Sequence, residues 1–263
     1  MREIRTCPVT GTTVVLNDGW PERPLPAVEA TSCWACGDRG PVIASLGEAR
    51  AVPHPVPALG LEGNAAPVPG LAVKRDAVGA HELILGPHGG GQADVLRLAA
   101  ERMVDLRRDS RLRGFALAQA VTPAGHDGWQ LFAFPFDLPP SAPARWRDAE
   151  LAQGARVVQL GESVVALAAW APRAAFETWI LPRQGAAHFV ASNVHEESSA
   201  LLHDVCSRLS RQLGGPAIDV TLEDGEPWRL VLRPRLQQPS LLPALGYPIV
   251  GVFPEFAARA LRA

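Results

Sequence analysis

The sequence predicts an α+β fold made of two similar halves, each with antiparallel strands and one helix packed across them. Two observations predict it. A pattern of strand, helix, strand, turn and strand occurs twice along the chain. The last strand of each copy also carries the spacing Trp-x-Leu-x-x-x-Pro, at 129–135 and at 228–234. With 263 residues, the chain is long enough for the halves to build a substantial core.

Residues 1–78 precede the first copy and are rich in Pro and Gly, so we expect short strands and loops there. The first copy opens with an apolar strand at 81–88, which Gly86 and Pro87 end. A helix over about 94–108 follows, because Val95, Leu98 and Met103 mark one apolar face. Strands at 114–121 and 129–135 complete this copy.

The second copy opens with a strand at 176–183 and continues with a helix over about 196–213. Ser192 or Asn193 is the expected N-cap of this helix, and Gly214 is expected to stop it. Strands at 217–222 and 228–234 follow, and a short helix at 254–261 ends the chain. The proline-rich segment 136–147 reads as a linker, which divides the chain into halves 1–147 and 148–263.

Composition excludes several classes of partner. Hydrophobic residues make up 47% of the chain and charged residues 20%, as in an ordinary globular protein. The net charge of −2 gives no electrostatic footprint for nucleic acid or for an anionic membrane. No signal peptide and no apolar run of membrane-spanning length are visible. We therefore expect a cytoplasmic protein.

The clearest chemical motif is Cys33-Trp34-Ala35-Cys36, because two thiolates at this spacing can bind one tetrahedral zinc ion. A redox pair and two buried thiols are the alternatives. The following Gly37-Asp38-Arg39-Gly40-Pro41 cannot continue a helix, as a redox motif would require, so the metal is favoured. His88 and His126 are the candidates for two further ligands, because each lies next to an end of a predicted strand. The remaining histidines show no comparable arrangement.

Several segments, in the same order, resemble the galactose-1-phosphate uridylyltransferase family, a duplicated branch of the histidine-triad superfamily. The resemblance covers nearly the whole chain and implies two histidine-triad-like halves. The matching segments are Arg5-Thr6-Cys7-Pro8-Val9-Thr10-Gly11, Arg23-Pro24, Cys33-Trp34-Ala35-Cys36, Gly79-Ala80-His81-Glu82-Leu83-Ile84, Asp109-Ser110-Arg111, Ala171-Pro172-Arg173 and Phe176-Glu177-Thr178-Trp179-Ile180-Leu181-Pro182.

The central motif of that family, His-x-His-x-Gln, reads His126-Asp127-Gly128-Trp129-Gln130 in this chain. The resemblance makes His126 a zinc ligand beside Cys33, Cys36 and His88, with zinc as the cofactor. Gly128 replaces the nucleophilic histidine. Since glycine has no side chain to attack phosphorus, the covalent histidine mechanism of the family is impossible at this position. The second-half His-x-His, which holds another metal in some members, reads Val231-Leu232-Arg233.

The resemblance implies a small-molecule ligand such as a nucleotide or a sugar phosphate. The expected substrate contacts are Arg23, Arg111, Arg113 and Gln130. No catalytic residue is assigned, and Gln130 and Asp127 are the only candidates. The leading hypothesis is an enzyme with altered chemistry on this scaffold. The alternative is a non-catalytic nucleotide-binding, regulatory or partner protein, for which the apolar strand from Trp129 to Phe134 offers a face for a homodimer.

Overall fold

A computed structural model of the chain describes residues 2–6, 13–17, 41–68, 70, 73–87, 92–121, 128–138, 144–185, 188–236 and 250–263. Its centre is one ten-stranded sheet in which all neighbouring strands are antiparallel. In spatial order the strands are β3 (Ala44–Leu46), β4 (Ala49–Pro53), β6 (Ala80–Leu85), β8 (Trp129–Phe134), β7 (Gly114–Val121), β12 (Ile218–Glu223), β13 (Arg229–Pro234), β11 (Thr178–Pro182), β10 (Val164–Ala168) and β9 (Val157–Leu160).

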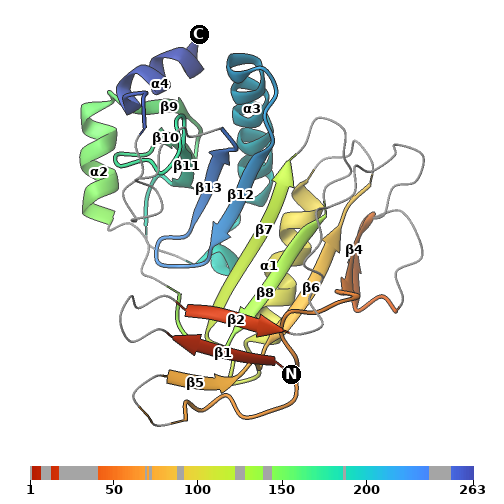
Figure 1. Cartoon of the computed structure of the whole chain (residues 1–263). Coiled ribbons are helices and arrows are strands. Elements are labelled where there is room, and N and C mark those ends of the chain that lie inside the picture. The colour runs from red at the N-terminus through yellow and green to blue at the C-terminus, as the bar shows by residue number, and fades with distance from the viewer. Residues whose placement is uncertain are drawn as a thin grey trace.

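The strand order confirms the predicted repeat. The first half runs β6, α1 (Ala93–Leu106), β7 and β8, and the second half runs β11, α3 (His195–Leu213), β12 and β13. From the seam between β7 and β12, equivalent strands follow in the same order toward both edges. The two halves therefore share one continuous sheet, which Figure 1 shows as a single twisted surface.

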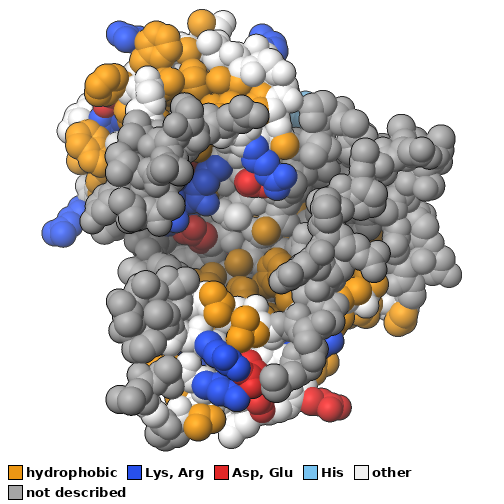
Figure 2. Space-filling view, viewed as in Figure 1, with side chains coloured by type: hydrophobic (Ala, Val, Ile, Leu, Met, Phe, Trp, Pro, Cys, Tyr) orange, Lys and Arg blue, Asp and Glu red, His pale blue; other side chains and the backbone are white. Residues whose placement is uncertain are grey.

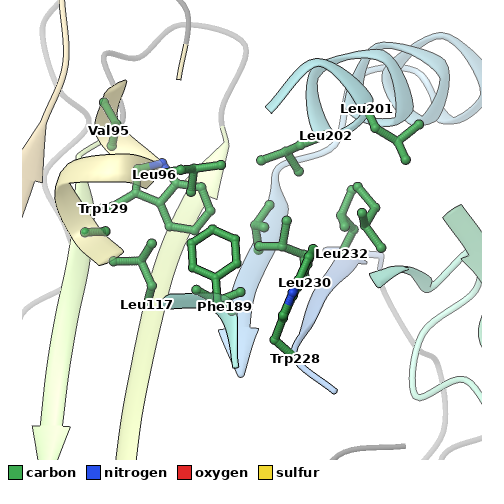
Figure 3. Packing of buried hydrophobic residues seen from close by; sticks show 14 of the residues in the cluster. Val95, Leu96, Leu117, Trp129, Phe189, Leu201, Leu202, Trp228, Leu230 and Leu232 are labelled. Atoms are coloured by element: carbon green, nitrogen blue, oxygen red, sulfur yellow. The ribbon is translucent and has the colours of Figure 1, made fainter. Parts of the chain in front are cut away.

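One face of the sheet carries the main hydrophobic core. Here α1 and α3 pack together and lie across the strands, and α4 (Pro254–Arg262) adds Ala257, Ala258 and Leu261 to the same core. Phe189, in the short 3-10 helix Phe189–Ala191, packs edge-on against Trp228, with ring centroids 5.0 Å apart. Figure 3 shows Phe189 between Trp129 and Trp228 at the seam. Residues of both halves therefore fill one core.

Within the described ranges, the elements on the opposite face, called the front face below, cover it only in part. A three-stranded sheet of β1 (Arg2–Thr6), β2 (Thr13–Asn17) and β5 (Val73–Asp76) packs Ile4 and Val15 against Phe132 and Phe134 of β8. At the other end, α2 (Ala144–Gln153) packs Trp146 and Leu151 over β10 and β11. Figure 2, viewed from this side, shows a hollow whose floor carries apolar side chains with charged side chains beside them.

The elements of both repeats are confirmed to within a few residues, but three elements outside them were not predicted. These are α2, β9 and β10. The predicted boundary between residues 147 and 148 lies inside α2, whose Arg147 is buried and donates from Nη1 to the carbonyl oxygens of Pro182 and Gly185. The linker prediction was therefore wrong for its last residues, because tertiary contacts hold a polar segment in a helix.

The two ends of α3 test two predictions, of which one is confirmed and the other is wrong. Gly214 ends the helix in the left-handed conformation, with φ of 76°, as predicted. The predicted N-cap was wrong, because the capping position is Val194 and the Ser192 hydroxyl donates to the carbonyl oxygen of Phe189 instead. The short 3-10 helix Phe189–Ala191 therefore engages Ser192, one of the two residues predicted as the N-cap. Among the described residues, no helix combines the length and apolar composition needed to cross a membrane.

Candidate functional site on the front face

Most of the residues that the sequence singles out lie outside the described residues. These are Arg23, Cys33, Cys36, His88, His126 and Asp127. Within the described ranges, no group of three or more His, Cys, Asp or Glu side chains could hold a metal ion. The structure does describe the strands that lead to His88 and His126. Because Ile84 of β6 pairs with Trp129 of β8, the C-terminal end of β6 and the N-terminal end of β8 lie side by side at the same end of the strands.

Gln130 lies on the front face, between the small sheet and the second half of the large sheet. The register of the sheet places Leu83, Gln130, Ala118, Thr221, Val231 and Trp179 in one row across six strands. Gly128 precedes Gln130 by two residues, and the alternation of a strand directs both positions to this face. Ala118 contributes only a methyl group between Gln130 and Thr221, whose strands lie about 10 Å apart on either side of β7.

His81 fixes the orientation of the Gln130 amide. The Nδ1 atom of His81 accepts a hydrogen bond from the backbone N–H of Ala58 at 3.1 Å, so the proton of the neutral ring is on Nε2. That Nε2–H donates to Oε1 of Gln130 at 3.0 Å. The NH₂ group of Gln130 therefore points away from His81. In the described part of the chain this NH₂ group has no protein acceptor.

The environment of His81 keeps its ring neutral. Burial and, to a lesser extent, the neighbouring His54 together lower the pKa of His81 to about 4, against the opposing effect of the Gln130 hydrogen bond. His54 stacks on His81 with centroids 3.9 Å apart, and His81 stacks on Phe132 at 4.2 Å. A neutral ring at pH 7 keeps the donor role of Nε2 constant. The orientation of Gln130 is then independent of pH across the physiological range.

His54 and His81 were missed by sequence reasoning, which found no arrangement among the remaining histidines. Their positions are 27 residues apart in the chain, with no motif linking them. Pairing of β4 with β6 brings Pro53 opposite Glu82 and so carries His54 next to His81. Two signals were available for His81: its place in the matching segment 79–84, and the alternation within β6, which places it on the same face as Leu83.

On the second half of the front face, charged side chains form defined pairs. Glu223 accepts from Arg229 at 2.7 Å, and the Arg229 guanidinium lies over the Trp179 ring at 4.5 Å. Glu177 is 2% exposed and accepts from Nε of Arg233 at 3.2 Å. Arg233 thus places a cation, paired with Glu177, on the second half of the front face.

A buried hydroxyl lies between these charged pairs and Gln130. Oγ1 of Thr221 is inaccessible to solvent and has no hydrogen-bond partner among the described residues. Unsatisfied buried polar atoms are uncommon in native proteins and call for a specific explanation. Thr221 shares the row with Gln130, but because solvent does not reach its Oγ1, the hydroxyl is not in contact with the open face.

Arg111 and Arg113 are not brought together with Gln130. Both precede β7, whose first residue Gly114 pairs with Phe134 at the far end of β8 from Gly128. Arg111 pairs with Asp109 at 2.7 Å and donates to the carbonyl oxygen of Leu61, and Arg113 pairs with Asp137. These arginines therefore lie at the end of the sheet that the small sheet covers.

The duplicated α+β fold, with one antiparallel sheet running through both halves and two helices on one face, is that of the uridylyltransferases. A solved structure of a uridylyltransferase has a TM-score of 0.76 to this chain at 14% identity, covering 99% of this chain and 97% of the other. The resemblance to the galactose-1-phosphate uridylyltransferase family, predicted from motifs, is thus confirmed in the fold. The low identity marks the chain as divergent.

Two plant proteins have the same fold. An ADP-glucose phosphorylase from Arabidopsis thaliana, solved with bound ADP-glucose, has a TM-score of 0.72 at 20% identity and covers 100% of this chain and 98% of its own. A GalT-like protein from Arabidopsis thaliana has a TM-score of 0.69 at 18% identity, with coverage of 100% and 98%. No protein-family model matches the sequence, and no curated protein matches it.

Proposed function

We propose that this chain is an enzyme of altered chemistry that holds a nucleotide-like, phosphate-bearing small molecule on the front face and forms no covalent histidine intermediate. The orientation of Gln130 is the observation that supports it most directly. His81 donates to the Gln130 carbonyl oxygen, so the two amide N–H groups of Gln130, which pairs with Ala118 in the sheet, are the donors proposed for the ligand. Amide donors suit phosphate oxygens, which are acceptors only.

Gly128 limits the reaction that such a ligand can undergo. Without a histidine at this position, the proposed transfer occurs by direct attack of a bound acceptor oxygen on phosphorus. The new P–O bond then forms as the bond to the leaving group breaks, and the proton of the acceptor leaves to solvent or to a nearby base. The protein contribution is to position both molecules and to stabilise charge on the phosphate.

The direct route is tested by searching for a covalent intermediate. The protein is incubated with UDP-glucose or ADP-glucose, quenched, and examined by intact-mass spectrometry. Exchange of uridylyl groups between UDP-glucose and galactose-1-phosphate is measured in parallel. We expect unmodified protein and no exchange through a bound intermediate. A nucleotidylated protein, or ping-pong exchange, would show that another residue replaces the histidine and would refute the proposal.

The same incubations separate an enzyme from a binding module. Nucleotide sugar that binds and is converted, with or without an added acceptor such as inorganic phosphate, supports the enzyme. A ligand that binds and is recovered unchanged with every acceptor supports the non-catalytic alternative.

We also propose that Cys33, Cys36, His88 and His126 hold one zinc ion. Two observations support it. The C-terminal end of β6, which precedes His88, lies beside the N-terminal end of β8, which follows His126. Zinc also prefers a tetrahedral set of ligands such as two Cys and two His. A closed set of this kind stabilises the fold when zinc is bound.

Metal analysis of the purified protein tests the zinc proposal. We expect about one zinc per chain, lost in Cys33→Ser together with a lower melting temperature. The control is His203→Ala, an exposed histidine on α3 that should leave the zinc content unchanged. Metal-free wild-type protein that is fully folded would refute it.

A further inference from the structure

A cavity of about 760 Å³ lies beside the first residues of β6, away from the strand end that meets Gly128. The described residues around it come from the loop 53–63, from the beginning of β6 and from the C-terminal part of α1. The volume falls within the range typical of small-molecule sites, roughly 300–1,000 Å³. His81 lines it too, so the cavity and Gln130 share one residue.

The walls of the cavity are largely apolar. Leu59 is buried beneath it, and Leu106 of α1 is partly buried at its side. Two further apolar lining residues are exposed, Ile43 by 41% and Leu61 by 63%. Keeping such side chains in contact with water forfeits the free energy that their burial would contribute. An apolar molecule in the cavity would recover part of it.

Ring-shaped side chains also line the cavity. Two prolines, Pro53 and Pro57, and the imidazoles of His54 and His81 contribute to the walls. Both faces of the His81 ring are already stacked, against His54 and Phe132. An aromatic ligand would therefore pack against the two prolines and His54, whose ring surfaces suit a planar partner.

A buried ion pair gives the apolar cavity one polar wall. Arg102 donates from Nε and Nη2 to the two carboxylate oxygens of Glu82, at 2.9 and 2.8 Å. Both side chains are at most 10% exposed. Because each charge is neutralised by the other, this wall offers hydrogen-bonding atoms without a net charge. A ligand with one donor or acceptor at its edge fits this wall.

The charged side chains among the described lining residues give no surplus positive charge. The acidic side chains Glu62 and Asp76 line it together with Glu82, whereas the lining cations are Arg2 and Arg102. Nη1 of Arg2 is directed to the carbonyl oxygen of Leu59 at 3.3 Å. An anionic ligand would therefore be disfavoured here. This distinguishes the cavity from the phosphate-binding role proposed for Gln130.

We propose that this cavity binds an uncharged aromatic small molecule carrying a single hydrogen-bonding group, as a second ligand site separate from the phosphate-bearing ligand of the front face. The site requires no nucleotide. Its test therefore stands whether or not the proposed function of the front face is correct.

The test uses a matched pair of fluorescent ligands. N-phenylnaphthylamine is uncharged, aromatic and carries one N–H, and anilinonaphthalene sulfonate has the same skeleton with an added anionic group. Each is titrated into the full-length protein and followed by its own emission. We expect saturable binding of the uncharged compound to one site per chain and binding of the sulfonate weaker by about tenfold or more. Equal affinities, or no binding of the uncharged compound, would overturn the proposal.

Variants locate the binding. Ile43→Trp narrows the mouth of the cavity and should weaken binding of N-phenylnaphthylamine by about tenfold. The control is Val42→Trp, at an exposed neighbour that does not line the cavity, and it should bind like wild type. A second pair on α1 is Leu106→Trp, which fills the cavity, and Val104→Trp, which is exposed outside it. Unchanged binding in both cavity variants, with the fold verified by circular dichroism, would place the ligand elsewhere and refute the site.

Discussion

At the scale of single residues, the orientation of Gln130 depends on one buried histidine. His81 is 4% exposed, and its two ring nitrogens have defined roles toward Ala58 and Gln130. A buried neutral histidine links the fold to pH, because the unfolded chain binds a proton that the folded chain excludes.

The pKa of His81 gives the pH range of this effect. The unfolded ring takes up a proton near pH 6.5 and the folded ring only near pH 4, so the unfolded state binds more protons between these values. We expect the free energy of unfolding to fall as the pH drops from 6.5 to 4, by on the order of 3 kcal/mol from this residue. Urea denaturation at several pH values measures it.

Two glutamine variants serve as test and control for the pH effect. His81→Gln should flatten the pH dependence, and His203→Gln, at an exposed position of α3, should retain it. An identical pH dependence in all three proteins would show that His81 does not carry the effect.

The same residues show the limit of sequence reasoning about the site. Gln130 was predicted as a substrate contact from the motif that surrounds it, and the structure places it on the front face. His81 was not predicted to matter. Its role depends on the register between β6 and β8 and on the path of the loop that brings Ala58 to it, and neither is encoded in local spacing.

At the scale of elements, the Glu82–Arg102 pair joins β6 to α1. Arg102 is also paired with Asp105 at 2.6 Å, which holds the C-terminal part of the helix in place. Removing one member of a buried ion pair leaves the other charge uncompensated. Replacing both members with apolar side chains leaves no buried charge and fills the space with apolar contacts.

Arg102→Met should therefore lower the free energy of unfolding by about 3–5 kcal/mol, because Glu82 would remain buried without its partner. The double variant Glu82→Met with Arg102→Met should recover most of that loss. The matched control is Arg108→Met, since Arg108 is 79% exposed and pairs with the same Asp105. Chemical denaturation measures all four proteins. A double variant no more stable than Arg102→Met would contradict this description of the pair.

The elements that were predicted and those that were missed differ in their pattern. The repeat helices and strands have clear apolar periodicity, and Gly214 marks an end that the structure confirms. By contrast, α2 has the sequence ARWRDAELAQ, in which polar and apolar residues do not separate onto two faces. Its helix depends on distant contacts such as those of Arg147 with Pro182 and Gly185. No local pattern contains that information.

At the scale of the whole molecule, the two halves form one sheet with a seam at β7 and β12. The repeat predicted two similar units, but nothing in either copy indicates which strands meet. The row that contains Gln130 crosses this seam to Thr221. The strand from Trp129 to Phe134, predicted as a dimer face, lies between β6 and β7, with α1 on one side and the small sheet over Phe132 and Phe134 on the other. Dimerisation itself stays a prediction.

The measurement that tests the central claim most directly is calorimetric titration of UDP-glucose and ADP-glucose into the wild-type protein and two matched variants. Gln130→Leu removes the amide donors of the front face, and Gln212→Leu changes an exposed residue of α3. We expect wild type and Gln212→Leu to bind one of the two ligands equally well, and Gln130→Leu to bind it about tenfold or more weakly, because a hydrogen bond to a charged phosphate is lost. Absence of binding to wild type, or equal affinity in all three proteins, would contradict the claim that a phosphate-bearing ligand is held at Gln130.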